Sequence, residues 1–315
     1  MLLLAGATSL PEIATTFTAV WIGNVSMAVH NLLGSVVFNT AALAIADFTA
    51  GSWALTHRSP KYVLRMEGVG VVFLLALVQL ADAVSRVTDQ SDVTAIVWGI
   101  GLILAYASLL YITHYSQKVP RWRPAPADDT HHSTGTSQPP SSEEAPPAER
   151  ENQRGYRDWS SPLLYCAFAA AGLIVLLGGA ILTRAGDALA TQTGLGGSFV
   201  GFTLLALSTT LPEISTTIAA ARSANYSMTV SNIFGSSAFV IMLLGVIAIF
   251  IGGETLTQAA SPSAMFAVVL GIVVTLVYLW GLLEREDRTL LRMGWDSAAV
   301  VVLVLVGSWV MFMLK

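Results

Sequence analysis

The chain has 315 residues, of which 54% are hydrophobic and only 11% are charged, and its formal net charge is −4. With a mean hydropathy of +0.66, this composition excludes an ordinary soluble domain and indicates a polytopic membrane protein that lies in a lipid bilayer. Nothing in the sequence indicates nucleic-acid binding, so we expect no nucleic-acid partner.

Nine apolar stretches are long enough to cross a bilayer as helices. In chain order they cover residues 1–21, 26–46, 62–83, 93–115, 161–183, 196–221, 226–251, 264–283 and 296–314. Between the fourth and fifth stretches, residues 116–160 are rich in Pro, Ser, Glu and Arg and nearly free of apolar residues. We therefore predict an all-α membrane protein with two halves, residues 1–115 and 161–315, joined by a disordered linker.

A carboxylate stands inside an apolar stretch at two places with the same surroundings, Leu10-Pro11-Glu12 and Leu211-Pro212-Glu213. Residues 1–39 align with residues 202–240 without a gap, at a constant offset of 201, and nineteen of the 39 positions are identical. General hydrophobicity does not produce matched Pro, Glu, Asn, Gly and Ser positions. The chain therefore contains an internal repeat.

The two copies of the repeat are predicted to cross the membrane in opposite directions, because an odd number of steps between spans separates their motif helices. This arrangement is an inverted repeat. Of the sixteen Lys and Arg residues, thirteen lie on one side of the predicted topology. Because cytoplasmic loops carry the excess of Lys and Arg, we expect a multi-pass protein of the cell membrane with a cytoplasmic linker at 116–160 and an external C-terminus.

The first copy begins later than the second. A whole span, 161–183, and part of the next precede Phe202 in the second copy, whereas nothing precedes Met1 in the first. We therefore expect the first half to be shorter by about 40 residues, which is one helix and part of another. A misassigned start codon and a loss of this element both explain the difference.

A carboxylate inside a bilayer costs several kcal/mol unless it is paired or binds a cation. Neither Glu12 nor Glu213 has a Lys or Arg within a helical turn or two, so a metal ion is the expected partner. The proline before each glutamate has no N–H, which deprives a carbonyl one turn earlier of its helical partner. These carbonyls and the neighbouring Ser and Thr hydroxyls, with Ser35 and Ser236 on the following helices, are hard oxygen ligands that suit Ca²⁺ and Na⁺.

The same residues can also be interpreted without an ion. A Leu-Pro-Glu sequence can place an ordinary first-turn charge at a helix start, and Gly and Ser commonly pack membrane helices; two inverted copies favour the ion site. An intramembrane enzyme is not supported, because no metal cluster, nucleophile elbow or phosphate loop is visible. We therefore predict neither enzymatic activity nor a resident cofactor. Asp47, Asp82, Asp187 and Glu254 fall at predicted helix ends, where we expect solvated interfacial charges.

At these residues the chain resembles the cation/Ca²⁺ exchanger superfamily, specifically its prokaryotic Na⁺/Ca²⁺ exchanger branch. The two signatures of that family are close to G-T-S-x-P-E followed by G-S-N-x-F-N. In this chain they correspond to residues 6–12 with 34–39, and to residues 208–213 with 235–240. The resemblance implies ten helices in two inverted repeats of five, nine of them visible here, with helices broken at Pro11 and Pro212.

The resemblance also implies a ligand set. Glu12 and Glu213 would be the shared Ca²⁺ carboxylates, and Thr8 and Thr209 would add carbonyl ligands. One flanking Na⁺ site would contain Ala5, Ser9 and Ser35, the other would contain Ala206, Thr210 and Ser236, and Asn39 would lie at the centre. The chain departs from the family pattern at Val240, which replaces an Asp or Asn, and at Val36 and Ser237, which replace the Asn after Gly-Ser.

Secondary antiport is the predicted function, with Ca²⁺ extruded in exchange for Na⁺ by a monomer with alternating access. Two alternatives stay open. The loss of a polar residue at Val240 is compatible with Ca²⁺/H⁺ antiport or exchange of another cation, and the late start of the first copy is compatible with a non-transporting remnant.

Overall fold

The computed structural model describes residues 8–49, 55–58, 62–85, 87, 91–118, 161–259, 261–284, 289–290 and 293–314. The first half contains helices α2 (Leu10–Trp21), α3 (Val25–Thr49), α4 (Leu55–Arg58), α5 (Tyr62–Ser85) and α6 (Asp92–Lys118). The second half begins with α8 (Ser161–Thr193), α9 (Gly196–Val200), the π-helical turn η1 (Gly201–Leu205), α10 (Ala206–Thr209) and α11 (Leu211–Arg222). It continues with α12 (Tyr226–Ile251), α13 (Gly253–Ala259), α14 (Pro262–Glu284) and α15 (Trp295–Met313). A short antiparallel ribbon of β1 (Thr289–Leu290) and β2 (Met293–Gly294) precedes α15.

The all-α membrane class is confirmed. Among the described residues, seven helices are long and apolar enough to cross a membrane: α3, α5, α6, α8, α12, α14 and α15. The bent pair Gly196–Thr209 and Leu211–Arg222 passes the same criterion as one span, which gives up to eight. The first predicted stretch, 1–21, contributes the 12-residue helix α2, and its first seven residues lie outside the described residues.

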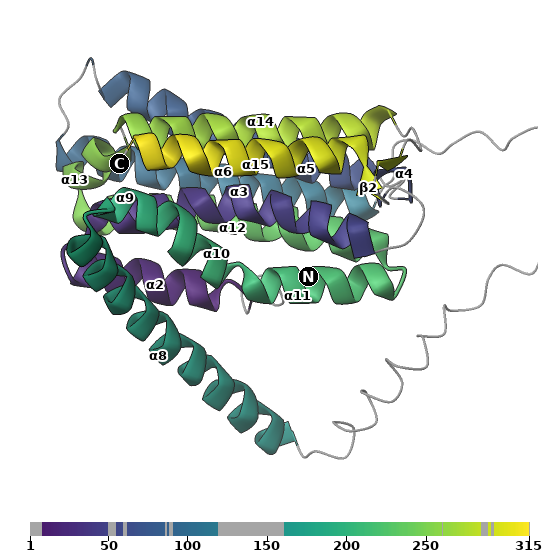
Figure 1. Cartoon of the computed structure of the whole chain (residues 1–315), viewed down its shortest axis with the longest axis horizontal. Coiled ribbons are helices and arrows are strands. Elements are labelled where there is room, and N and C mark those ends of the chain that lie inside the picture. The colour runs from purple at the N-terminus through teal and green to yellow at the C-terminus, as the bar shows by residue number, and fades with distance from the viewer. Residues whose placement is uncertain are drawn as a thin grey trace, which may run out of the picture.

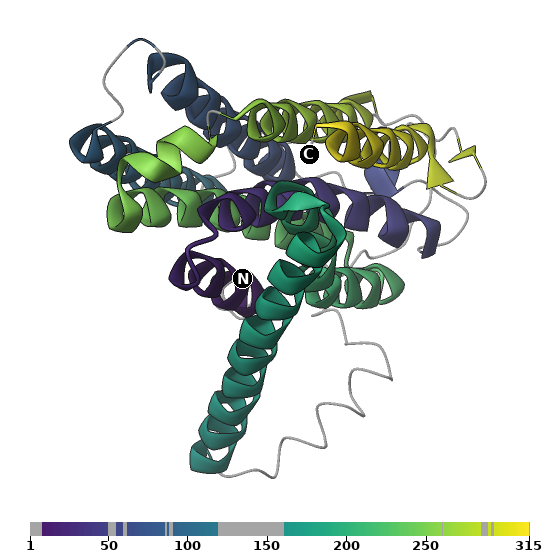
Figure 2. The same cartoon turned by 60° about the vertical axis from the view of Figure 1, so that its left-hand side comes forward.

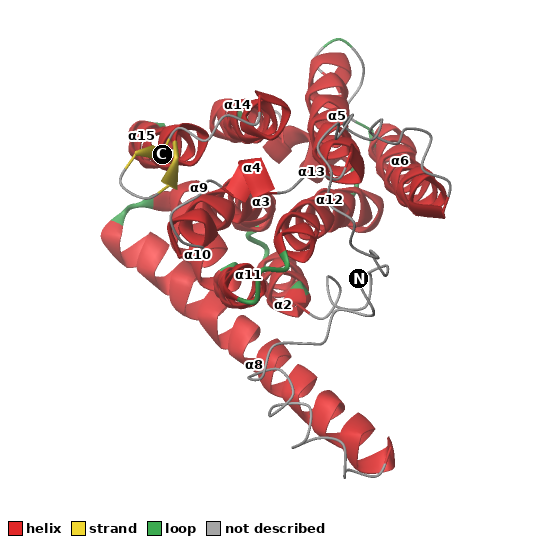
Figure 3. Ribbon diagram, turned by 90° about the vertical axis from the view of Figure 1, so that its right-hand side faces the viewer, coloured by secondary structure: helices red, strands yellow, loops and turns green. Residues whose placement is uncertain are grey.

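Helices α3 and α12 form the centre of the bundle. In Figures 1 and 3 they lie between a layer of α5, α6, α14 and α15 and a layer of α2 and α11. The halves exchange partners, because α3 of the first half packs against α14 and α15 of the second, and α12 packs against α5 and α6 of the first. Polar side chains on α3 and α12 are thereby buried in the interior of a membrane protein, where each needs a partner or a ligand.

Small residues bring the helices close enough for this packing. A Cβ atom on Gly99 of α6 would lie 2.5 Å from the carbonyl oxygen of Gly245 on α12, and a Cβ on Gly245 would lie 2.8 Å from that of Gly99. Helices in membranes associate largely through such close backbone contacts, since lipid gives them little hydrophobic drive to associate. The glycine pair therefore fixes α6 against α12.

Helix α8 has 33 residues and extends ten residues beyond the predicted stretch 161–183. The apolar run ends at Arg184, but the helix continues, and Asp187 in this extension accepts a hydrogen bond from the Asn24 amide at 2.8 Å. Asp187 is therefore a partnered, partly buried group, and the expectation of a merely solvated charge is wrong. One turn earlier, the Thr183 hydroxyl donates to the carbonyl of Thr15 on α2 at 3.3 Å. The N-terminal part of α8 projects from the bundle (Figure 2).

Two further acids that were expected at solvated helix ends differ from each other. Asp82 near the end of α5 is buried, so the expectation of a solvated charge is wrong there, and the Gln79 amide lies 3.5 Å from one of its oxygens. Glu254 at the start of α13 is exposed, as expected.

The elements recur in the same order in both halves. Helices α2 and α11 have 12 residues each, and each is followed by a long central helix of 25 or 26 residues. This recurrence matches the sequence repeat. Helix α6 ends at Lys118 instead of residue 115, and residues 119–160 of the predicted linker lie outside the described residues, so the linker and the two domain boundaries stay predictions.

Candidate cation site

Each Pro-Glu sequence begins a helix with the same local backbone. Pro11 and Pro212 lie in the first turns of α2 and α11, where a missing N–H breaks no helical hydrogen bond. The residue two positions before each proline is similar in conformation, with φ −86° and ψ 9° at Ser9 and φ −76° and ψ −8° at Thr210. Its carbonyl accepts the N–H four residues on, at 3.1 Å from Ile13 in one copy and 3.0 Å from Ile214 in the other.

The second copy shows what precedes this turn. The π-helical turn η1 runs into α10, and α10 meets α11 at an angle of 41°, so the helix is broken next to Pro212 as predicted. Pro212 has no N–H that could donate to the Ser208 carbonyl one turn earlier. That carbonyl accepts a backbone N–H at the end of α10 instead. The corresponding residues before Thr8 lie outside the described residues, so a break at Pro11 stays a prediction.

Glu12 and Glu213 are both completely buried. Neither oxygen of Glu12 accepts a hydrogen bond of ordinary geometry from a described residue, and the Oε2 atom of Glu213 also has no such partner. The Thr209 side chain faces Glu12, Thr8 and Ser9 face Glu213, and the two carboxylates are close enough to repel each other. A buried, repelling pair of carboxylates with so few partners is stable only if it is neutralised, which a bound cation or a proton would do.

Hydroxyl groups join the two copies around these carboxylates. Ser236 on α12 donates to Oε1 of Glu213 at 3.2 Å, and its oxygen lies 3.0 Å from that of Ser9 in the first copy. Ser35 on α3 lies 3.4 Å from the Thr209 hydroxyl of the second copy. Both contacts, Ser9 with Ser236 and Ser35 with Thr209, therefore join a residue of one half to a residue of the other.

Asn39 lies one helical turn after Ser35 on α3 and contacts the residue that follows Ser236 on α12. Its amide donates to the Ser237 hydroxyl at 3.4 Å, while its Oδ1 atom is buried without a partner among the described residues. Val240, at the position equivalent to Asn39, is fully buried, and so is Val36, at the position equivalent to Ser237. Polar groups therefore line this part of the site from one position in each copy.

Thr210 and Ala206, which were predicted to bind Na⁺ together, are hydrogen-bonded to each other. The Thr210 hydroxyl donates to the Ala206 carbonyl within its own chain segment at 2.7 Å, and Thr209 donates to the same carbonyl at 3.1 Å. The Ala206 carbonyl is thus already engaged, although a carbonyl oxygen can accept more than one contact. Ala5 lies outside the described residues.

A pair of asparagines that was not predicted from the sequence holds the glutamate helices. Asn31 on α3 donates to the Thr15 hydroxyl of α2 at 3.0 Å, and Asn232 on α12 donates to the Thr216 hydroxyl of α11 at 3.2 Å. These threonines in turn donate to the carbonyls of the prolines before Glu12 and Glu213, at 2.8 and 3.0 Å. Both asparagines and both threonines are identical positions of the repeat, so the repeat alignment carried this signal.

The donor set fits a hard cation as a transported substrate. Across the described part of the chain, no three His, Cys, Asp or Glu side chains gather in a way that could hold a metal. Two carboxylates with Ser, Thr and Asn oxygens are therefore the available ligands. Oxygen ligands of this kind suit Ca²⁺ and Na⁺.

Three comparisons relate the chain to known proteins. The sequence profile of the family described as "Sodium/calcium exchanger protein" matches residues 1–115 and 163–314. A protein from Alkalimonas amylolytica named "Putative antiporter CaxA" is 25% identical over 296 residues, which cover 91% of this chain and 80% of that protein. The solved structure titled "Structure of native YfkE" matches with a TM-score of 0.64 and 14% identity, covering 99% of this chain and 83% of the other, which shows a common fold.

Proposed function

Because the chain belongs to the sodium/calcium exchanger protein family, we propose that it is a secondary active antiporter that extrudes Ca²⁺ in exchange for Na⁺. The observation that carries the proposal is the pair of fully buried carboxylates, Glu12 and Glu213, brought together from the two copies of the repeat. Neither oxygen of Glu12 has a hydrogen-bond partner among the described residues, so both oxygens are available to an ion. The two glutamates would share Ca²⁺, and the hydroxyls around them would supply flanking ligands for Na⁺.

Alternating access is the mechanism that this arrangement supports. In an inverted repeat, the ion site lies between two equivalent units, and motion of one unit against the other opens it to each side in turn. The pairing of Ser9 with Ser236 and of Ser35 with Thr209 supports such a site, because each contact crosses between the copies. The excess of Lys and Arg in predicted loops supports a cytoplasmic linker and an external C-terminus, and we take a monomer as the transporting unit.

H⁺ is the second candidate for the coupling ion, and a specific residue favours it. Val240 is buried where the repeat has Asn39, so one half of the site offers an apolar wall instead of an oxygen ligand. Fewer oxygen ligands weaken a site for Na⁺, whereas a proton needs only one carboxylate. Ca²⁺/H⁺ antiport or exchange of another cation for H⁺ would then use the same two glutamates.

Uptake of ⁴⁵Ca²⁺ into vesicles that contain the full chain tests the proposal, with Na⁺ and pH gradients imposed separately. We expect uptake driven by the Na⁺ gradient, and its loss in Glu12→Gln and Glu213→Gln. Glu254→Gln on α13 is the matched control, because Glu254 is an exposed carboxylate. Uptake driven only by the pH gradient would select the H⁺ alternative, and normal uptake in Glu213→Gln would refute the two-glutamate site.

A further inference from the structure

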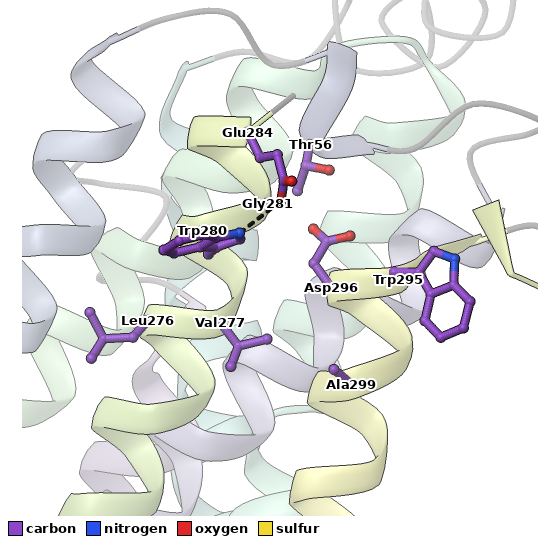
Figure 4. A pocket seen from close by; sticks show the side chains of 9 residues that line it. All are labelled: Thr56, Leu276, Val277, Trp280, Gly281, Glu284, Trp295, Asp296 and Ala299. Carbon is purple, nitrogen blue, oxygen red and sulfur yellow. Dashed lines mark hydrogen bonds between the residues drawn. The ribbon is translucent and has the colours of Figure 1, made fainter. Parts of the chain in front are cut away.

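A second acidic region lies away from the glutamate pair, at the end of the bundle where α4 and β2 are found (Figure 1). Between α14 and α15 there is a cavity of about 690 Å³, and its lining includes Thr56, Trp280, Glu284, Trp295 and Asp296. Figure 4 shows the Asp296 carboxylate on α15 pointing toward Thr56 on α4, with Glu284 on α14 at the same end of the cavity. The remaining wall is apolar, so the polar groups are confined to one end.

Asp47 of α3 lies next to this end and increases its negative charge. It is completely buried, and its two oxygens accept the N–H groups of Leu55 at 2.5 Å and Gly294 at 2.7 Å. The expectation of a solvated interfacial Asp47 is therefore wrong, because two backbone N–H groups replace water around the carboxylate. The charge of Asp47 acts directly on Asp296, so the two carboxylates repel each other.

Buried polar atoms at this place lack partners. The hydroxyl of Tyr278, a fully buried residue, has no hydrogen-bond partner among the described residues, although both Asp47 and Asp296 lie near enough to act on it. The Oδ2 atom of Asp296 is likewise buried without a described partner. It occupies the space that a Cβ atom on Gly281 would fill. A hydroxyl and a carboxylate oxygen left unpaired in one region are groups that a bound ion with its water would satisfy.

We propose that the Asp296 carboxylate at this end of the cavity, with the charges of Asp47 and Glu284 near it, binds a divalent cation of the Ca²⁺ class. The Trp280 indole N–H donates to one oxygen of Glu284 at 2.7 Å (Figure 4), so Glu284 would act mainly through its charge. Asp296 with Thr56 and Tyr278 supplies hard oxygen ligands, and Asp47 and Glu284 supply negative potential. No three carboxylates among the described residues gather closely enough to hold a metal by themselves, so hydroxyl groups and water would have to complete the coordination of the ion. Ca²⁺ tolerates such a mixed and irregular set of ligands.

The cation site would serve to concentrate the ion at this end of the bundle. A cleft lined by charges of one sign raises the local concentration of counter-ions. In the orientation proposed above, this end faces the cytoplasm, from which Ca²⁺ would be exported. That role rests on the proposed function, whereas cation binding at Asp296 does not.

Equilibrium dialysis of ⁴⁵Ca²⁺ with the purified full chain in detergent tests the site. The double variant Glu12→Gln/Glu213→Gln removes the carboxylates of the first site and serves as the background. We expect this background to bind about one Ca²⁺ per chain, with a Kd on the order of 10⁻⁴ M, as expected for a site with few protein ligands. Adding Asp296→Asn and Glu284→Gln should abolish that binding, and adding the control Glu254→Gln should leave it unchanged.

A second measurement does not depend on how the acidic variants fold. Tb³⁺ bound in the cavity would lie near Trp280 and Trp295, so excitation of tryptophan should sensitise its emission. In the same background, Trp295→Phe should lower this emission while ⁴⁵Ca²⁺ binding stays unchanged.

Absence of Ca²⁺ binding in the background would overturn the proposal. Displacement of Ca²⁺ by tetramethylammonium but not by Mg²⁺ would also overturn it. Binding here with no transport by the parent chain would refute the antiport proposal alone.

Discussion

Gly34 on α3 tests whether close helix packing positions the glutamate site. A Cβ atom at Gly34 would overlap with the carbonyl oxygen of Phe202 in η1 and would lie 2.7 Å from the Cβ of Ala206 in α10. Because one obstacle is backbone, no side-chain rotation relieves the clash. Ordinary contact begins at 3.4 Å, so in Gly34→Ala the helices must separate by about 0.7 Å at Ala206, which is the difference between the two distances.

The net destabilisation follows from two opposing terms. Overpacking of this kind costs about 1–3 kcal/mol, and replacing Gly by Ala in a helix returns about 1 kcal/mol. We expect Gly34→Ala to lower the free energy of unfolding by up to about 2 kcal/mol and to reduce ⁴⁵Ca²⁺ transport, because α10 carries Thr209.

Gly101→Ala on α6 is the matched control for this substitution. Its Cβ would meet nothing within 4 Å, so only the helix-propensity gain should be seen. Unfolding in detergent and vesicle transport measure both variants. If Gly34→Ala and Gly101→Ala behaved alike in stability and transport, close packing at Gly34 would have no part in positioning the site.

Three further substitutions test the polar contacts around the site. Asn31→Val removes the amide that α3 presents to α2, and it should lower stability by about 1 kcal/mol, as expected for one buried hydrogen bond; unchanged unfolding would contradict this. Asp187→Ala removes the acceptor of the Asn24 amide, and hydrogen exchange in the C-terminal part of α8 should accelerate by about fivefold, whereas an unchanged rate would show that the contact is not stabilising. Val240→Asn should cost about 1–3 kcal/mol by burying an amide without a partner, and addition of Val36→Ser should recover part of the loss; no recovery would exclude the pairing of these two positions.

The components of the glutamate site could be predicted from the sequence because polar residues in an apolar stretch stand out, and because each occurs twice. Glu12, Glu213 and the flanking hydroxyls were identified in this way. The partners of the hydroxyls could not be predicted, since the contact between Ser9 and Ser236 joins residues 227 positions apart. Only the packing of α2 and α12 against the same helix, α3, determines that distance.

The wrong predictions for acidic residues have a common physical origin. Asp47 and Asp187 were expected to be solvated because a charge at the end of an apolar stretch is normally near water. In the structure, backbone N–H groups surround Asp47, and the Asn24 amide contacts Asp187. Such partners come from other elements of the chain, and no pattern within α3 or α8 reveals them.

The departures from the family pattern at Val240 and Ser237 concern equivalent contacts in the two copies. Asn39 contacts Ser237 across the two copies. Under the offset of 201, that contact is equivalent to one between Val240 and Val36, both of which are buried. The chain therefore has a polar pair, Asn39 with Ser237, in one place and an apolar pair, Val240 with Val36, in the equivalent place. The apolar pair contains no buried amide that would need a hydrogen-bond partner. The apolar residue at 240 therefore faces the same test as its equivalent neighbour at 36, which is the double variant Val240→Asn/Val36→Ser.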